Sequence, residues 1–136
     1  MKLISSKYTS TGLSFGLLLL RVVAGSTMLA NHGMKKITNF EAIVLKGFAD
    51  PIGIGAKYSL SLAIFAEVFC AVLLIIGLLT RIATIPLIIA MCVALFAAHK
   101  GLVFGEGELP AVFLTIFITI LLTGPGKYSL DKLIGK

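Results

Sequence analysis

Four long apolar runs dominate this chain of 136 residues. They cover about residues 13–34, 58–79, 82–99 and 109–123, and a helix of about 20 residues crosses the roughly 30 Å hydrocarbon core of a bilayer. Apolar residues make up 58% of the chain and charged residues 13%, which leaves too little polar surface to cover a soluble globule. The sequence therefore predicts an all-α integral membrane protein, a four-transmembrane-helix bundle in a single domain over 1–136.

The connections between the runs constrain how the helices pack. Little more than Thr80 and Arg81 joins the second run to the third, so these two helices must be antiparallel neighbours. Between the first two runs, residues 39–49 repeat apolar side chains at helical spacing. They are Phe40, Ile43, Val44 and Phe48. This pattern predicts a short amphipathic helix at the membrane interface, acting either as a lid or as a connector that shields the helix ends.

The distribution of basic residues favours one orientation. The two tails and the Thr80–Arg81 turn carry six Lys and Arg, against five on the other two loops. The positive-inside rule therefore predicts that both termini are cytoplasmic. The formal charge of +6 is scattered over both membrane faces, which argues against a nucleic-acid partner. A cleaved signal peptide is not expected, because Arg21 interrupts the first run before any cleavage site.

Arg21 and Glu67 are the charges that lie deepest in the apolar runs. A charge at the centre of a bilayer costs at least about 2.5 kcal/mol, so an unpaired one is not expected there. Counted from the ends of their runs at 1.5 Å per residue, the two depths differ by about 6 Å. The sequence therefore predicts an ion pair between them. Such a pair either fixes the register of the helices or forms the polar floor of a ligand cavity.

A second polar group is expected at the outer ends of the helices. Antiparallel topology brings together the side chains that end helices one and three and begin helix four. They are His32, Lys35, His99, Lys100, Glu106 and Glu108. Histidines and carboxylates can bind a divalent metal or exchange protons with a quinone head group. No HxxxH or HxxE spacing is present, so no metal site is predicted and a quinone is the cofactor considered.

Cys70 and Cys92 are the only thiols, and their positions on adjacent helices place them at similar depth. They form either a redox-active thiol pair or, as we prefer, inert packing, because a thiol in apolar surroundings has a raised pKa. The chain contains no phosphate-binding glycine loop, nucleophilic serine elbow or haem attachment motif. No catalytic residue is predicted, and any reaction would need a borrowed cofactor or partner.

Three segments together resemble the DoxX family of small bacterial membrane proteins. They are RVVAGSTMLANHGMKK (Arg21 to Lys36), AEVFCAVLLIIGLLTRIATIP (Ala66 to Pro86) and LLTGPGKYSLDKLI (Leu121 to Ile134). The resemblance runs along almost the whole chain. It implies a four-helix bundle in the bacterial inner membrane and an association with redox systems, including thiosulfate:quinone oxidoreduction and oxidative-stress complexes that contain superoxide dismutase and a sulfurtransferase.

Three functions remain open at this point. The first is a membrane subunit of a quinone- or thiol-linked redox system that binds a quinone-like ligand inside the bundle. The second is a non-catalytic scaffold whose tail recruits soluble redox enzymes. The third is a carrier for a small solute or lipid, for which a homo-oligomer would be needed.

Overall fold

The computed structural model describes residues 2–135, and within them every regular element is a helix. The first long helix is continuous from Ser10 to Thr38 and comprises α1 (Ser10–Met28), the π-helical turn η1 (Leu29–Gly33) and α2 (Met34–Thr38). The second comprises α4 (Ala56–Ile64), the π-helical turn η2 (Phe65–Cys70) and α5 (Ala71–Ile76). The third comprises α6 (Thr80–Cys92) and the π-helical turn η3 (Val93–Ala98). The remaining helices are α3 (Phe40–Lys46), α7 (Glu108–Thr123) and α8 (Leu130–Leu133).

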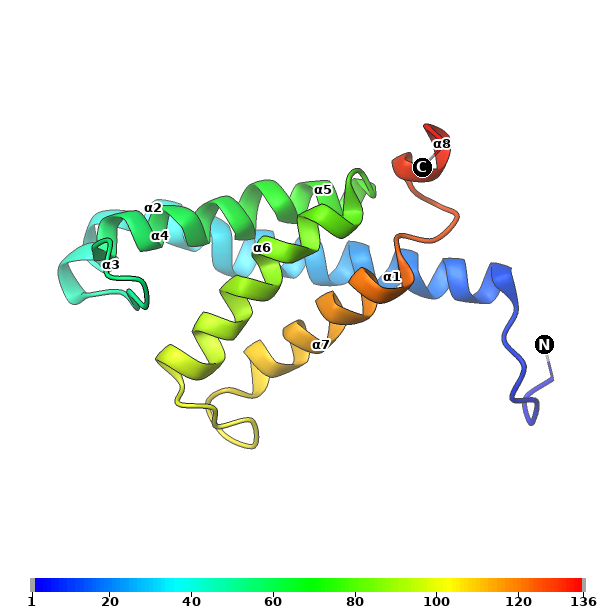
Figure 1. Ribbon diagram of the computed structural model, residues 1–136, viewed down its shortest axis with the longest axis horizontal. Helices are drawn as coiled ribbons and strands as arrows, with labels where there is room; N and C mark the ends of the chain where they lie inside the picture. The colour runs from blue at the N-terminus through cyan, green and yellow to red at the C-terminus, as the bar shows by residue number, and fades with distance from the viewer. Residues whose placement is uncertain (1, 136) are drawn as a thin grey trace.

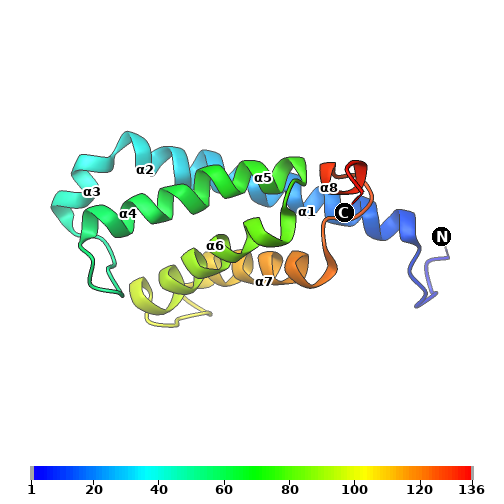
Figure 2. The same ribbon diagram turned by 45° about the horizontal axis from the view of Figure 1, so that its top comes forward.

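The long helices form two antiparallel pairs, which Figures 1 and 2 show side by side. The first helix packs on α4 and α5, and α6 packs on α7. The pairs converge where α5 turns into α6 and α7 leads into α8, close to both chain termini; we call this the terminal end. They diverge toward α3 and the connection over residues 99–107, which we call the loop end. The buried core, which includes Met28, Leu74, Leu87 and Phe117, joins both pairs.

The predicted helical membrane bundle is confirmed. The helices Ser10–Thr38, Ala56–Ile76 and Thr80–Ala98 are long and apolar enough to cross a membrane, and α7 is a shorter apolar helix of 16 residues. The first helix begins at Ser10, where the Thr9 hydroxyl accepts a hydrogen bond from the Gly12 amide and so caps the helix. The short helix predicted between the first two runs is present as α3. Its position at the membrane interface stays a prediction.

Arg21 ties the first helix to two other parts of the chain at the terminal end. Its side chain is 1% exposed and donates hydrogen bonds to four backbone carbonyl oxygens. They belong to Leu74 (3.0 Å), Ile75 (3.1 Å), Pro125 (2.8 Å) and Tyr128 (2.9 Å). The first two lie in the last turn of α5, where the Leu74 carbonyl also accepts a hydrogen bond from the Gly77 amide (3.2 Å), and the other two lie in the C-terminal tail. The guanidinium therefore supplies charged donors to both the end of α5 and the tail.

Asp131 completes this connection from the tail. Its carboxylate accepts hydrogen bonds from the amides of Leu79 (2.7 Å) and Thr80 (2.9 Å) at the start of α6, and its own amide donates to the Gly77 carbonyl (2.9 Å). A carboxylate at a helix N-terminus is favoured because it pairs orphan amides and faces the positive end of the helix dipole. We call Arg21 together with residues 124–131 the C-terminal clamp.

Replacing Asp131 by alanine is expected to destabilise the folded protein by about 2 kcal/mol, because the amides of Leu79 and Thr80 lose their acceptor in a buried setting. Unfolding of the detergent-solubilised protein by added SDS measures the loss. Lys132→Ala changes an exposed neighbour in the same short helix and is the matched control. Equal stability of the two variants would contradict the capping role.

Candidate functional site: a cavity between the diverging helix pairs

A cavity of about 610 Å³ lies where the helix pairs diverge. Its wall comes from α2, α4, α6, α7, the π-helical turns, the connection that follows α3 and the connection over residues 99–107. Most of the wall is apolar and includes Phe65, Pro86, Ala94 and Phe113. The polar side chains that reach it are His32, Lys36, Ser59, Glu67, His99 and Glu106. The cavity can therefore hold an apolar body and offer hydrogen bonds to a polar group.

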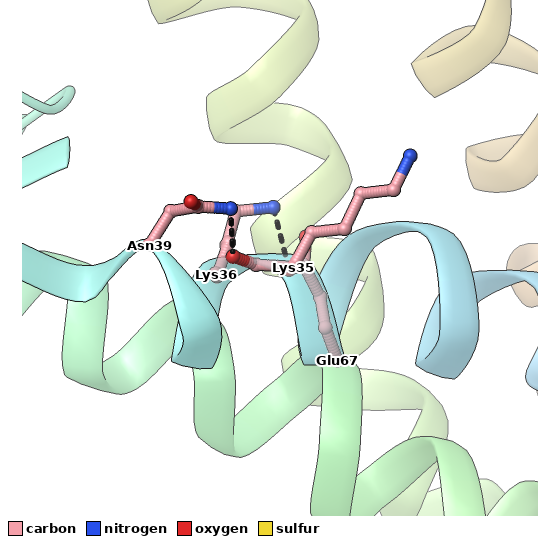
Figure 3. A network of polar contacts seen from close by, with 4 residues as sticks. All are labelled: Lys35, Lys36, Asn39 and Glu67. Carbon is pink, nitrogen blue, oxygen red and sulfur yellow. Dashed lines mark hydrogen bonds and ion pairs between the residues drawn. The ribbon is translucent and has the colours of Figure 1, made fainter. Parts of the chain in front are cut away.

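An ion pair between Lys36 and Glu67 is the strongest electrostatic feature of the cavity wall. The Lys36 Nζ atom lies 2.6 Å from Oε2 of Glu67, which is only 3% exposed. Figure 3 shows the two side chains pointing toward each other, Lys36 from α2 and Glu67 from η2. Each side chain stabilises the charged form of the other in apolar surroundings. Removing one partner of such a buried pair strongly destabilises the folded protein.

The predicted ion pair between Arg21 and Glu67 is wrong. Arg21 lies beside the end of α5, whereas the residue of the first helix that lies against the Glu67 backbone is Gly33. At 1.5 Å per residue, Arg21 and Gly33 are separated by about 18 Å along the helix, which no arginine side chain spans. The prediction measured depth from the ends of the apolar runs. The structure instead shifts the first helix toward the terminal end, where the tail covers Arg21.

Lys35 was predicted to belong to the polar group at the helix ends, but it is exposed and its neighbour Lys36 makes the ion pair. The π-helical turn η1 explains the difference, because it adds one residue to a turn and so rotates everything that follows. The buried series Arg21, Gly25 and Met28 thus continues at Gly33. The Lys35 carbonyl accepts a hydrogen bond from Asn39 Nδ2 (2.9 Å). The Lys35 side chain extends away from the Lys36–Glu67 pair (Figure 3).

All three π-helical turns of the described chain contribute to the cavity wall. His32 comes from η1, Glu67 from η2 and Ala94 from η3. A π-helical turn inserts a residue and redirects the side chains around it, and such turns are frequent at functional sites. Their gathering around one cavity marks this region as the candidate site.

The other predicted polar residues are only partly brought together. His32 is half-buried and stands edge-on to Phe113, with ring centroids 5.8 Å apart. His99 and Glu106 also line the cavity, but Glu108 is exposed in the first turn of α7 and does not. Within residues 2–135, no three His, Cys, Asp or Glu side chains are grouped as metal ligands.

The two cysteines lie outside the candidate site. Cys70 is buried, Cys92 is half-buried, and both thiols are free. Neither lines the cavity. The thiol pair considered from the sequence therefore has no access to a ligand held there.

The connection between α3 and α4 closes one side of the cavity, and Asp50 shapes it. The Asp50 carboxylate accepts hydrogen bonds from the Ile54 amide (3.0 Å), the Gly55 amide (2.8 Å) and the Ser59 hydroxyl (2.8 Å). These bonds, that of Ser59 above all, lower the pKa of Asp50 below its usual range. The ionised carboxylate thus holds a turn whose neighbour Phe48 lines the cavity.

Lys36 is the site residue that sequence reasoning missed. It belongs to the segment that carries the resemblance, and it directly follows the residue that was chosen. The number of residues in the helical turn η1 decides which of the two lysines points inward. A helix with the ordinary 3.6 residues per turn was assumed for the prediction.

The fold and the site define a class: a small, multi-pass helical membrane protein with a buried ion pair beside an apolar cavity. Residues 16–100 match the DoxX family. Because this match covers more than half of the chain, the protein belongs to the DoxX family. The matched range contains Arg21, Lys36 and Glu67 but ends before α7 and before residues 124–131 of the C-terminal clamp. Searches of curated proteins and of solved structures gave no match.

Proposed function

We propose that the protein is the membrane subunit of a redox system and binds a quinone-like molecule in the cavity between its helix pairs. The observation that best supports this proposal is a cavity of about 610 Å³ with the Lys36–Glu67 pair in its wall. Pockets for small organic molecules usually measure about 300–1,000 Å³ and are apolar with a few polar groups that fix orientation. An isoprenoid quinone has this division into an apolar tail and a polar ring.

The position of the cavity supports entry of the ligand from the bilayer. Leu62, Phe65 and Ile89 line the cavity and are 56%, 48% and 58% exposed. In a membrane-spanning bundle these exposed apolar side chains face lipid tails. A ligand dissolved in the bilayer can thus enter the cavity along an apolar surface without passing through water.

The polar groups of the wall suit the head group of such a ligand. The Lys36 ammonium can donate a hydrogen bond to a carbonyl oxygen, and Glu67 and His32 can exchange protons with it. Reduction of a quinone to a quinol takes up two electrons and two protons. In this proposal the chain binds the ring and handles the protons, while a soluble redox partner delivers the electrons. We place the protein in the bacterial inner membrane with both termini cytoplasmic.

Filling the cavity tests this proposal. Ala94→Phe places a ring where the ligand would lie, and we expect it to weaken binding of a soluble quinone analogue by at least about tenfold. The matched control is Ala97→Phe, which changes an exposed residue of the same helical turn that does not line the cavity. Binding is measured by titration of the protein in lipid nanodiscs. Equal affinity of the two variants would refute a ligand in this cavity.

A scaffold for soluble redox enzymes is the second candidate, and the C-terminal clamp favours it. Arg21 and Asp131 hold the tail in one position, and Leu133 and Ile134 near its end are 80% and 56% exposed. A fixed segment with exposed apolar side chains suits a docking partner. If quinone analogues do not bind the wild-type protein, this reading replaces the first.

A further inference from the structure

A second hollow, of about 360 Å³, lies at the loop end between the first helix and α3. Its chemistry is opposite to that of the cavity, because most of its lining residues are basic or carry amides. They are Asn31, His32, Lys35, Lys36, Asn39 and Lys46. Two apolar residues of α3 complete the wall, and no carboxylate of the described chain lines it.

Two of the three lysines in this hollow have no acidic partner among residues 2–135. Lys36 is paired with Glu67, whereas Lys35 and Lys46 form no ion pair with any carboxylate of residues 2–135. Like charges around one concave surface repel each other, and an anion placed between them removes that repulsion. The hollow thus has unused positive charge together with amide donors.

We propose that this hollow binds a phosphate group. Lysine ammonium groups bind phosphate as point charges, and the Asn31 amide and the His32 ring can add hydrogen bonds. The hydrogen bond from Asn39 to the Lys35 carbonyl holds the end of α2 beside the hollow. The phosphate belongs either to inorganic phosphate or to the head group of an anionic lipid, and both present the same charged oxygens.

This site adjoins the proposed quinone site and shares two wall residues with it, but its free charges belong to the hollow alone. Lys35 and Lys46 line the hollow but not the cavity, while His32 and Lys36 line both. Substitution of the first two lysines therefore removes phosphate binding and leaves the Lys36–Glu67 pair in place. The hollow can be confirmed or rejected whether or not a quinone binds.

The test compares two double variants with the same change in charge. Lys35→Gln with Lys46→Gln removes the free charges of the hollow. Lys57→Gln with Lys100→Gln removes two exposed lysines at the same end of the bundle that do not line it. The full chain is placed in phosphatidylcholine nanodiscs and titrated calorimetrically with inorganic phosphate. In parallel, native mass spectrometry measures the phosphatidylglycerol retained from mixed nanodiscs.

Saturable phosphate binding that weakens by about tenfold or more in the first variant, and stays within about twofold in the second, supports a site for free phosphate. Retention of phosphatidylglycerol by the wild type and the second variant, lost in the first and without phosphate binding, supports a lipid head group. Both outcomes support the hollow as a phosphate site. If neither probe separates the two variants, the proposal is overturned.

Discussion

Replacing Arg21 by leucine is expected to destabilise the folded protein by about 3–5 kcal/mol, because hydrogen bonds from a buried charged donor to several carbonyls are lost together. Four backbone carbonyls of α5 and the tail lose a charged donor at once. The Leu74 carbonyl keeps the Gly77 amide as a donor, whereas a buried carbonyl left without any donor costs about 1–3 kcal/mol before the structure relaxes. Arg21→Lys is expected to recover less than half of the loss. A lysine has one ammonium, whereas the planar guanidinium presents five donors to several acceptors.

Unfolding by added SDS measures this effect, and Lys127→Leu, which removes an exposed charge from the same tail, is the control. A double variant with Glu67→Leu adds a second check. Because Arg21 and Glu67 lie about 18 Å apart along the helix axis, their effects should add within about 0.5 kcal/mol. A coupling energy well above that value would indicate a direct Arg21–Glu67 ion pair and would contradict the structure.

The helices were largely predictable because apolar length determines what can cross a bilayer. The short antiparallel connection between the second and third helices was also predictable, but its position was wrong: the connection lies at residues 77–79, and Thr80 and Arg81 begin α6. The partner of Arg21 was not. It depends on how far the first helix slides along the second, and that offset is fixed by a tail more than 100 residues away in the chain. No local pattern encodes such a contact.

The candidate site shows a second limit of sequence reasoning. His32, Glu67, His99 and Glu106 were chosen from the sequence and line the cavity. Lys36 was passed over because one π-helical turn rotates the end of the first helix. Such a turn is stabilised by the packing of η1 against η2, not by the local sequence alone. The identity of the ion pair is thus a tertiary property.

Replacing Lys36 by methionine is expected to destabilise the protein by about 3–5 kcal/mol, because it leaves the Glu67 carboxylate buried without a partner. The double variant Lys36→Met with Glu67→Met should recover most of this loss, since an apolar pair of similar volume often matches or exceeds the stability of a buried ion pair. Lys35→Met, at the exposed neighbouring position, should change stability by less than about 0.5 kcal/mol. SDS unfolding provides all four values, including the Glu67→Met single variant.

The recovered double variant then separates structure from function. It keeps the apolar cavity and the fold but removes the ammonium of Lys36 and the carboxylate of Glu67 from the cavity wall. If the pair serves only to hold the helices, quinone-analogue binding in nanodiscs will survive in this variant. We expect binding to weaken by at least about tenfold instead, because the charged groups that would fix the orientation of the head group are gone. A stable double variant that binds the analogue as tightly as the wild type would assign Lys36 and Glu67 to the fold alone.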